Sequence, residues 1–266
     1  MTFADWANYF SANQDHLDNL SWDDSYRLTE RELRAIRFSL PQFQQGENSE
    51  GKHLYQKAKD LGNPDYVAAI RLFIREEQGH ARVLGQYMAI HQLPRLCKSS
   101  GLDKVFRWLR QWASLEHTLR VLLTAEIIAA VYYQALYQAT YSGLLQQICR
   151  RILRDEEMHL NFQCFTLTQI TRGQNGFRRW ATRQAYRTLM AGTTLVVWFA
   201  YHRTLRAGGF GLLAFADTVS IEFGRVEEML AAPGGIFVRG EEAVKSTVPA
   251  KPSPTFQPTS VELQPL

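Results

Sequence analysis

Two Glu-x-x-His tetrads, at positions 77–80 and 156–159, constrain the fold of this chain more than any other feature of its sequence. Residues three positions apart lie on one face of an α-helix, so each tetrad directs a carboxylate and an imidazole to the same side. A lone glutamate in an apolar helical pattern precedes each tetrad at the same distance, Glu47 before the first and Glu126 before the second. The repeat predicts two equivalent helical halves that supply six metal ligands: Glu47, Glu77, His80, Glu126, Glu156 and His159.

Turn signals in the sequence support this pairing. In an antiparallel helical hairpin, two residues lie at the same level when they are equally far from the turn. The midpoint of the first Glu pair falls in Leu-Gly-Asn-Pro-Asp at 61–65, and the midpoint of the second pair falls beside Tyr-Ser-Gly at 141–143. Such Gly and Pro clusters end one helix and begin the next. Each half is therefore predicted to be a hairpin, and two hairpins form a four-helix bundle.

A third tetrad, from Glu50 to His53, fits the same pattern, so position on the helix has to decide between the candidates. His53 shares its side of the predicted helix with polar residues, whereas the stripe through Glu47 is otherwise apolar. We expect Glu47 to be the ligand from the first helix, with Glu50 as the alternative, and His53 to face water. Apolar residues at helical spacing also surround the other candidate ligands, and buried charges among them are costly unless they are coordinated.

Residues beside the candidate ligands have predicted supporting roles. A ligating imidazole usually donates its other N–H to a carboxylate or a carbonyl. Glu76 and Asp155 each precede a ligand glutamate by one residue. If the two halves face each other, Asp155 orients His80 and Glu76 orients His159; the alternative is that both acids lie on the surface. Tyr133 is a candidate for a hydrogen bond or an electron transfer near the metals, with core packing as its alternative role.

Taken together, these motifs resemble the ferritin-like di-iron carboxylate superfamily over roughly residues 38–170. The resemblance implies an antiparallel four-helix bundle, two iron ions with at least one bridging glutamate, and a reaction with dioxygen or peroxide. Manganese or a mixed Mn/Fe pair suits the same oxygen and nitrogen ligands. The ligand plan is shared by storage ferritins, rubrerythrins, oxygenases, desaturases and ribonucleotide reductase small subunits, so it identifies no single member.

Features outside the ligand plan favour an oxygen-activating enzyme. The three cysteines, Cys97, Cys149 and Cys164, form no Cys-x-x-Cys pair, so an external electron donor is expected. The chain keeps both tetrads and continues for nearly a hundred residues beyond the predicted bundle, which ends at about 171. We expect an oxidoreductase that oxidises or oxygenates a small to medium, largely apolar organic substrate, which enters between the bundle and the helices at 176–230. The alternatives are an iron-storing or peroxide-detoxifying ferritin-like protein, a non-catalytic scaffold and a membrane-surface hydroxylase.

The helical pattern predicts one all-α domain at 1–232. A capping-box pattern from Thr29 to Glu32 indicates a helix that runs toward Ser39. We expect a core bundle at about 38–171 with added N-terminal and C-terminal helices. The bundle helices are predicted at 41–60, 64–92, 114–141 and 143–171, a crossover helix at 99–112, and the added C-terminal helices at 176–206 and 210–230. The Pro-rich end, 233–266, is predicted to be disordered.

The composition is that of a soluble protein, with 45% hydrophobic and 21% charged residues. No apolar run is expected to reach the length of a bilayer span, the most apolar being 189–201. The first residues lack a secretion signal, so we expect a cytoplasmic protein. Arginines around Trp180 form a basic stretch without any nucleic-acid motif, and no nucleic-acid partner is expected. A homodimer is one possible assembly.

Overall fold

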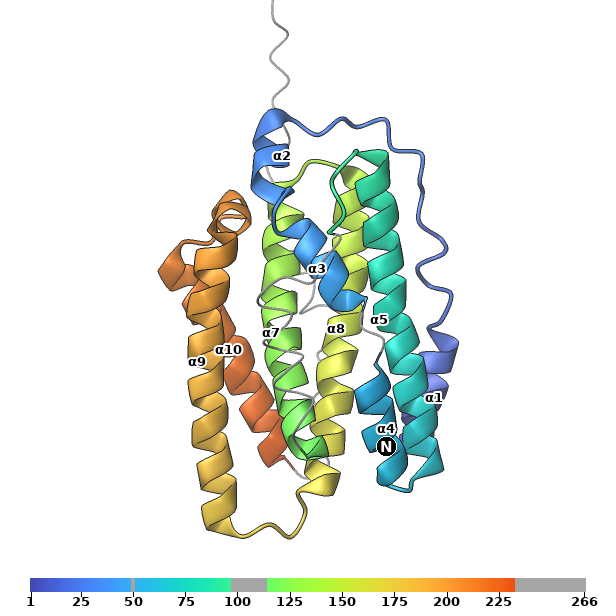
Figure 1. The fold of residues 1–266 in the computed structure, drawn as a ribbon, viewed down its shortest axis with the longest axis vertical. Helices are drawn as coiled ribbons and strands as arrows, with labels where there is room; N and C mark the ends of the chain where they lie inside the picture. The colour runs from blue at the N-terminus through green and yellow to red at the C-terminus, as the bar shows by residue number, and fades with distance from the viewer. Residues whose placement is uncertain (49–50, 97–113, 233–266) are drawn as a thin grey trace, which may run out of the picture.

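The computed structural model describes residues 1–48, 51–96 and 114–232, and all regular structure within these ranges is α-helical, without strands. Three long helices, α5, α7 and α8, run side by side along the length of the molecule (Figure 1). The predicted crossover helix at 99–112 and the predicted disordered end at 233–266 lie outside the described residues. The helices are α1 (Phe3–Ala12), α2 (Glu30–Ile36), α3 (Leu40–Glu47), α4 (Lys52–Asp60), α5 (Pro64–Ile90), α7 (Leu115–Ala139), α8 (Gly143–Ile170), α9 (Gly176–Ala207) and α10 (Leu212–Ala231).

Capping residues set where the core helices begin. The Asn63 side chain accepts a hydrogen bond from the Tyr66 amide and Pro64 occupies the first turn of α5, while the Ser142 side chain caps α8 at the Leu145 amide. Thr29 and Glu32 form the predicted capping box of α2. Both predicted turns are confirmed, because α4 reverses into α5 and α7 reverses into α8 at the expected positions.

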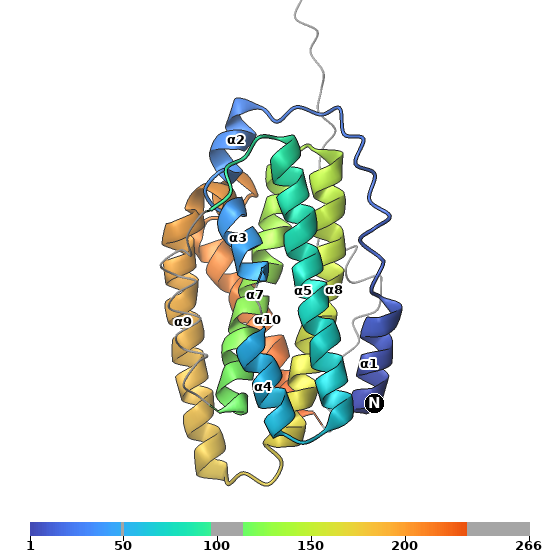
Figure 2. The same ribbon diagram turned by 45° about the vertical axis from the view of Figure 1, so that its right-hand side comes forward.

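The first core helix differs from the prediction. Instead of one helix at 41–60, the structure has α3 and α4 with a break after Glu47. Asn48 leaves helical geometry with ψ 46°, and Gly51 has a left-handed φ of 60°. Glycine adopts this conformation without the steric cost that a side chain brings. The break leaves Glu47 as the last residue of α3. Helix α3 ends at mid-height of the molecule, beside α5 (Figure 2).

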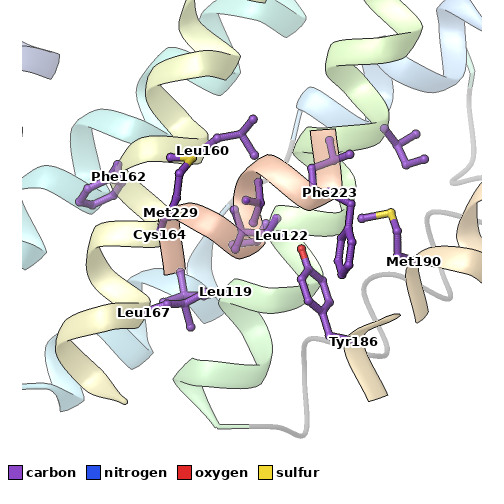
Figure 3. Packing of buried hydrophobic residues seen from close by; sticks show 14 of the residues in the cluster. Leu119, Leu122, Leu160, Phe162, Cys164, Leu167, Tyr186, Met190, Phe223 and Met229 are labelled. Atoms are coloured by element: carbon purple, nitrogen blue, oxygen red, sulfur yellow. The ribbon is translucent and has the colours of Figure 1, made fainter. Parts of the chain in front are cut away.

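The apolar core consists of two clusters, which along α5 and α8 lie on either side of a polar level. In α5, Ile70 and Phe73 belong to one cluster, and Leu84 and Met88 belong to the other. The first cluster continues into α9 and α10, where Tyr186, Phe223 and their neighbours are buried against α7 and α8 (Figure 3). The two added C-terminal helices are thus present at the expected positions and are packed onto the core.

Helix α7 corrects the expectation that no segment is long and apolar enough to span a membrane. By length and composition it meets that criterion, as the one such helix among the described residues. However, 78% of its apolar window is buried inside the protein. A helix that is covered by neighbours on several sides, as α7 is by α8, α9 and α10, is apolar around most of its circumference.

Gly208 provides a test of how closely α9 approaches α7. A Cβ atom at this position would lie 2.2 Å from the backbone oxygen of Ala135, and a backbone atom cannot move aside as a flexible side chain can. We expect Gly208→Ala to lower the free energy of unfolding by about 1–3 kcal/mol or more, because overpacking displaces one helix from the other.

Gly192→Ala, inside the helix that Gly208 caps, is the control, because a Cβ atom at position 192 would have no other atom within 4 Å. This change should leave stability unaltered or raise it by up to about 1 kcal/mol, through the better helix propensity of alanine. Denaturant unfolding of both variants measures the difference. Equal stability of the two variants would contradict the close approach of α9 to α7.

Candidate metal centre

Four core segments bring the six predicted ligands to one level between the two apolar clusters. Glu47 comes from the end of α3, one tetrad from α5, Glu126 from α7 and the other tetrad from α8. They form two overlapping groups, within each of which the potential ligand atoms all lie within 4.8 Å of one another. One group is Glu47, Glu77, His80 and Glu156; the other is Glu77, Glu126, Glu156 and His159.

The atoms that face the centre of these groups are buried without hydrogen-bond partners. They are one oxygen of Glu77, both carboxylate oxygens of Glu156, and Nδ1 of both His80 and His159. His159 Nδ1 lies 3.0 Å from Glu77 Oε1, yet the two atoms are not aligned for a hydrogen bond. Buried polar groups normally have partners, and a cluster of acceptors without donors fits a bound cation.

The outer nitrogens of both imidazoles are held by carboxylates. His80 Nε2 lies 2.9 Å from Asp155 Oδ2, and His159 Nε2 lies 2.8 Å from Glu76 Oε2. These are the two contacts expected from the sequence, each made across the two halves; their role at a metal stays a prediction. An Nε2–H that donates to a carboxylate leaves the Nδ1 lone pair free to bind a metal.

Two further hydrogen bonds hold the lone glutamates. Tyr133 Oη donates to Glu47 Oε1 at 2.5 Å, and Gln163 Nε2 donates to Glu126 Oε1 at 2.7 Å. Tyr133 therefore makes the contact that was considered for it, while the sequence pattern did not single out Gln163. Each lone glutamate has one oxygen fixed in this way, and the other remains available to an ion.

Burial and neighbouring charges raise the pKa values of two glutamates and a histidine in this centre. Burial, followed by the charges of Glu126 and Glu47, raises the pKa of Glu77 to about 8, although 17% of its side chain is exposed. Burial and Glu126 also raise the pKa of Glu156 well above its ordinary value. For His80, burial alone would lower the pKa, but the carboxylates of Asp155 and Glu47 raise it well above 6.5. Without a metal, the centre therefore retains protons.

A third cluster, formed by His16, Glu76 and Asp155, also meets a simple distance criterion for a metal site. Its carboxylate oxygens, however, already accept hydrogen bonds from N–H groups. Asn13 Nδ2 lies 2.6 Å from Glu76 Oε1 and 3.2 Å from Asp155 Oδ1, and His16 Nε2 lies 2.6 Å from Asp155 Oδ2. Donors occupy the positions that a cation would need, so we assign this cluster as a hydrogen-bonded network.

Sequence reasoning did not single out Asn13 and gave His16 a structural or exposed position only, because neither residue lies in a ligand pattern. They contact partners far away along the chain, and no local signal in the sequence points to them. His53 is exposed, as expected, whereas Glu50 lies outside the described residues, so the choice between Glu47 and Glu50 rests on the placement of Glu47 alone.

The donor set of the centre suits a first-row transition metal. Carboxylate oxygens and imidazole nitrogens bind iron, manganese and zinc, and no thiolate takes part among the described residues. Burial makes these charges costly when no counter-charge is present. Because the carboxylates have the same charge and lie close together in the core, they also repel one another. The buried Glu and His groups can thus hold a metal ion.

Replacing a ligand carboxylate should separate metal binding from folding. We expect Glu77→Gln to weaken metal binding by more than about 100-fold, because loss of even an outer partner typically costs 10- to 100-fold. The metal-free variant should be at least as stable as the metal-free wild type, since an amide replaces an acid that burial and its neighbours make costly to ionise. Metal analysis and urea unfolding measure the two effects. Glu228→Gln, at an exposed position on α10, is the control and should change neither property.

The raised pKa of Glu77 predicts a pH dependence of the metal-free protein. An acid whose folded pKa is raised stabilises the fold fully below its unfolded pKa of 4.5, and this stabilisation is lost as pH rises toward about 8. Unfolding in urea with a chelator should show stability falling between pH 6 and pH 8, by up to about 1.4 kcal/mol per pH unit for each proton. The slope should be smaller in Glu77→Gln; equal slopes would contradict this assignment.

Comparison of the chain with protein-family models, with curated proteins and with solved structures gave no match. The functional interpretation therefore depends on the geometry of the residues themselves.

Proposed function

We propose that this chain is a ferritin-like di-metal carboxylate oxidoreductase that uses two iron ions to activate dioxygen. The observation that carries the proposal is the overlap of the two ligand groups, which share Glu77 and Glu156. Shared carboxylates suit a pair of ions bridged by the same side chains. Glu47 and His80 would hold one ion, Glu126 and His159 would hold the other, and Glu77 and Glu156, which belong to both groups, would be available to both ions.

The order and direction of the helices support the assignment to the ferritin-like bundle. The broken pair α3 and α4 supplies one glutamate, α5 supplies a tetrad, and the α7–α8 hairpin repeats the same plan. In ferritin-like di-metal proteins two helices contribute Glu-x-x-His and the other two contribute one Glu each, all projecting inward. The contribution of each core segment follows this plan.

Bound iron would supply the electrons for the reduction of dioxygen, and the chain's own residues would control geometry and water. Asp155 and Glu76 fix the imidazoles, and Tyr133 holds its hydroxyl proton at Glu47. The ring of Phe73 packs edge-on against His159 with centroids 4.7 Å apart and, with Phe10, forms an apolar wall beside the centre. Such a wall excludes water, which would otherwise compete for the ions.

The substrate would be a small to medium apolar molecule. An external donor would supply the electrons that return the iron to its reduced state. Cys149 and Cys164 are buried and free, so neither belongs to an electron-carrying cluster among the described residues. The expected entry route between the bundle and the added helices gains no support, because buried side chains such as Tyr186 and Met229 fill that interface (Figure 3).

Metal analysis combined with spectroscopy tests the proposal. Protein purified from iron-supplemented cells should contain about two iron ions per chain, because six ligands that include two shared carboxylates suit a pair of ions. Anaerobic reduction followed by exposure to air should produce an oxygen-dependent absorption band. Gel filtration separates the remaining classes, since a storage protein would form a large shell and an enzyme of this kind a monomer or dimer.

The decisive controls are Glu77→Ala and Glu156→Ala, which remove the two shared carboxylates. Wild-type metal content in either folded variant would contradict the proposed centre. Wild-type protein that resists iron loading and stays folded without metal would assign the chain to the class of helical scaffolds.

A further inference from the structure

The chain segment that follows α1 is fixed at the outer side of the candidate metal centre. Asn13 caps the end of α1, and His16 lies one turn further along. Arg151 of α8 donates hydrogen bonds to the backbone carbonyls of His16 and Asn19. His16 Nδ1 also lies 2.5 Å from the carbonyl oxygen of Asn13. The segment thus has a defined position against α8, although none of its residues is among the proposed metal ligands.

The Asn13 amide joins the two halves of the centre. Glu76 and Asp155 are equivalent positions of the repeat, because each precedes a ligand glutamate and each holds the imidazole of the opposite half. The single Asn13 Nδ2 group lies within hydrogen-bond distance of both carboxylates, at 2.6 Å and 3.2 Å. Its loss would remove one hydrogen bond from each of the two carboxylates that hold the imidazoles.

His16 acts on one half only. Its Nε2 lies 2.6 Å from the same Asp155 oxygen that accepts from His80 Nε2 at 2.9 Å. Among the described residues, the hydrogen bonds to Glu76 come from Asn13 and His159 alone, with no counterpart of His16. The repeat is therefore symmetric in its ligands and asymmetric in the residues that support them.

We propose that Asn13 and His16 are positioning residues for the metal centre: Asn13 acts on both metal positions, and His16 acts on the position bound by His80. The inference rests on the proposed function, because it concerns how tightly the two ions are held. Outer partners of ligating residues typically contribute 10- to 100-fold to metal affinity. A residue that supports one imidazole should affect one binding step, and a residue that supports both should affect both.

Stepwise binding of Co²⁺ to the metal-free full-length chain, followed by visible absorption and chelator competition, tests this inference. We expect His16→Ala to weaken one of the two binding steps by about 10- to 100-fold and Asn13→Leu to weaken both by similar factors. His16→Gln should restore part of the loss, since its amide can donate to Asp155. Asn19→Ala removes the same side-chain type from an exposed position of this segment and should bind Co²⁺ as the wild type does.

The metal-free stability of each variant separates positioning from general loosening. A merely structural role would lower stability and weaken both steps alike in His16→Ala, which would overturn the inference. Two unchanged binding steps in folded His16→Ala and Asn13→Leu would also overturn it, while the proposed function would stand. Wild-type protein that binds no Co²⁺ would overturn both. If Asn13→Leu does not fold, the inference is still tested by His16→Ala, which should weaken one Co²⁺ binding step only, and by His16→Gln, which should restore part of that loss.

Discussion

The burial of several carboxylates at one level of the core is the constraint on which the rest of this structure depends. Glu47, Glu126 and Glu156 are each at most 6% exposed, and they converge with Glu77 on the same small volume. Like charges at such distances in a region of low dielectric repel each other by several kcal/mol, so the fold needs protons or cations among them. The nitrogens and oxygens that face this volume without hydrogen-bond partners fit bound cations as well as protons.

The surrounding structure limits where those charges can move. Tyr133 and Gln163 each hold one oxygen of a lone glutamate, and carboxylates from the opposite half hold the imidazoles. Two apolar clusters close the core on either side of this level. Polar networks in a low-dielectric interior are stabilising when every member has a partner. Here the outer nitrogens of both imidazoles have carboxylate partners, whereas the inner Nδ1 atoms and the oxygens of Glu156 have none.

The positions of the six candidate ligands were predictable from the sequence because they depend on two short-range rules, helical periodicity and the level of residues around a turn. The break after Glu47 was not predicted, since the apolar stripe continues through Gly51 and hides the change in backbone conformation. The apolar character of α7 was underestimated, although its bounds were predicted closely, because isolated charges such as Glu126 interrupt its hydrophobic run without preventing its burial.

By itself, the sequence determined the all-helical class, the two hairpin turns, and the six side chains that meet at one level, because each follows from local spacing along a helix. Only the tertiary structure decided which residues support that centre. Asn13 and His16 meet Asp155 across more than a hundred positions of the chain. No periodicity links residues so far apart; their contact arises from the way α1 and the segment after it pack on α5 and α8, which is a property of the folded core as a whole.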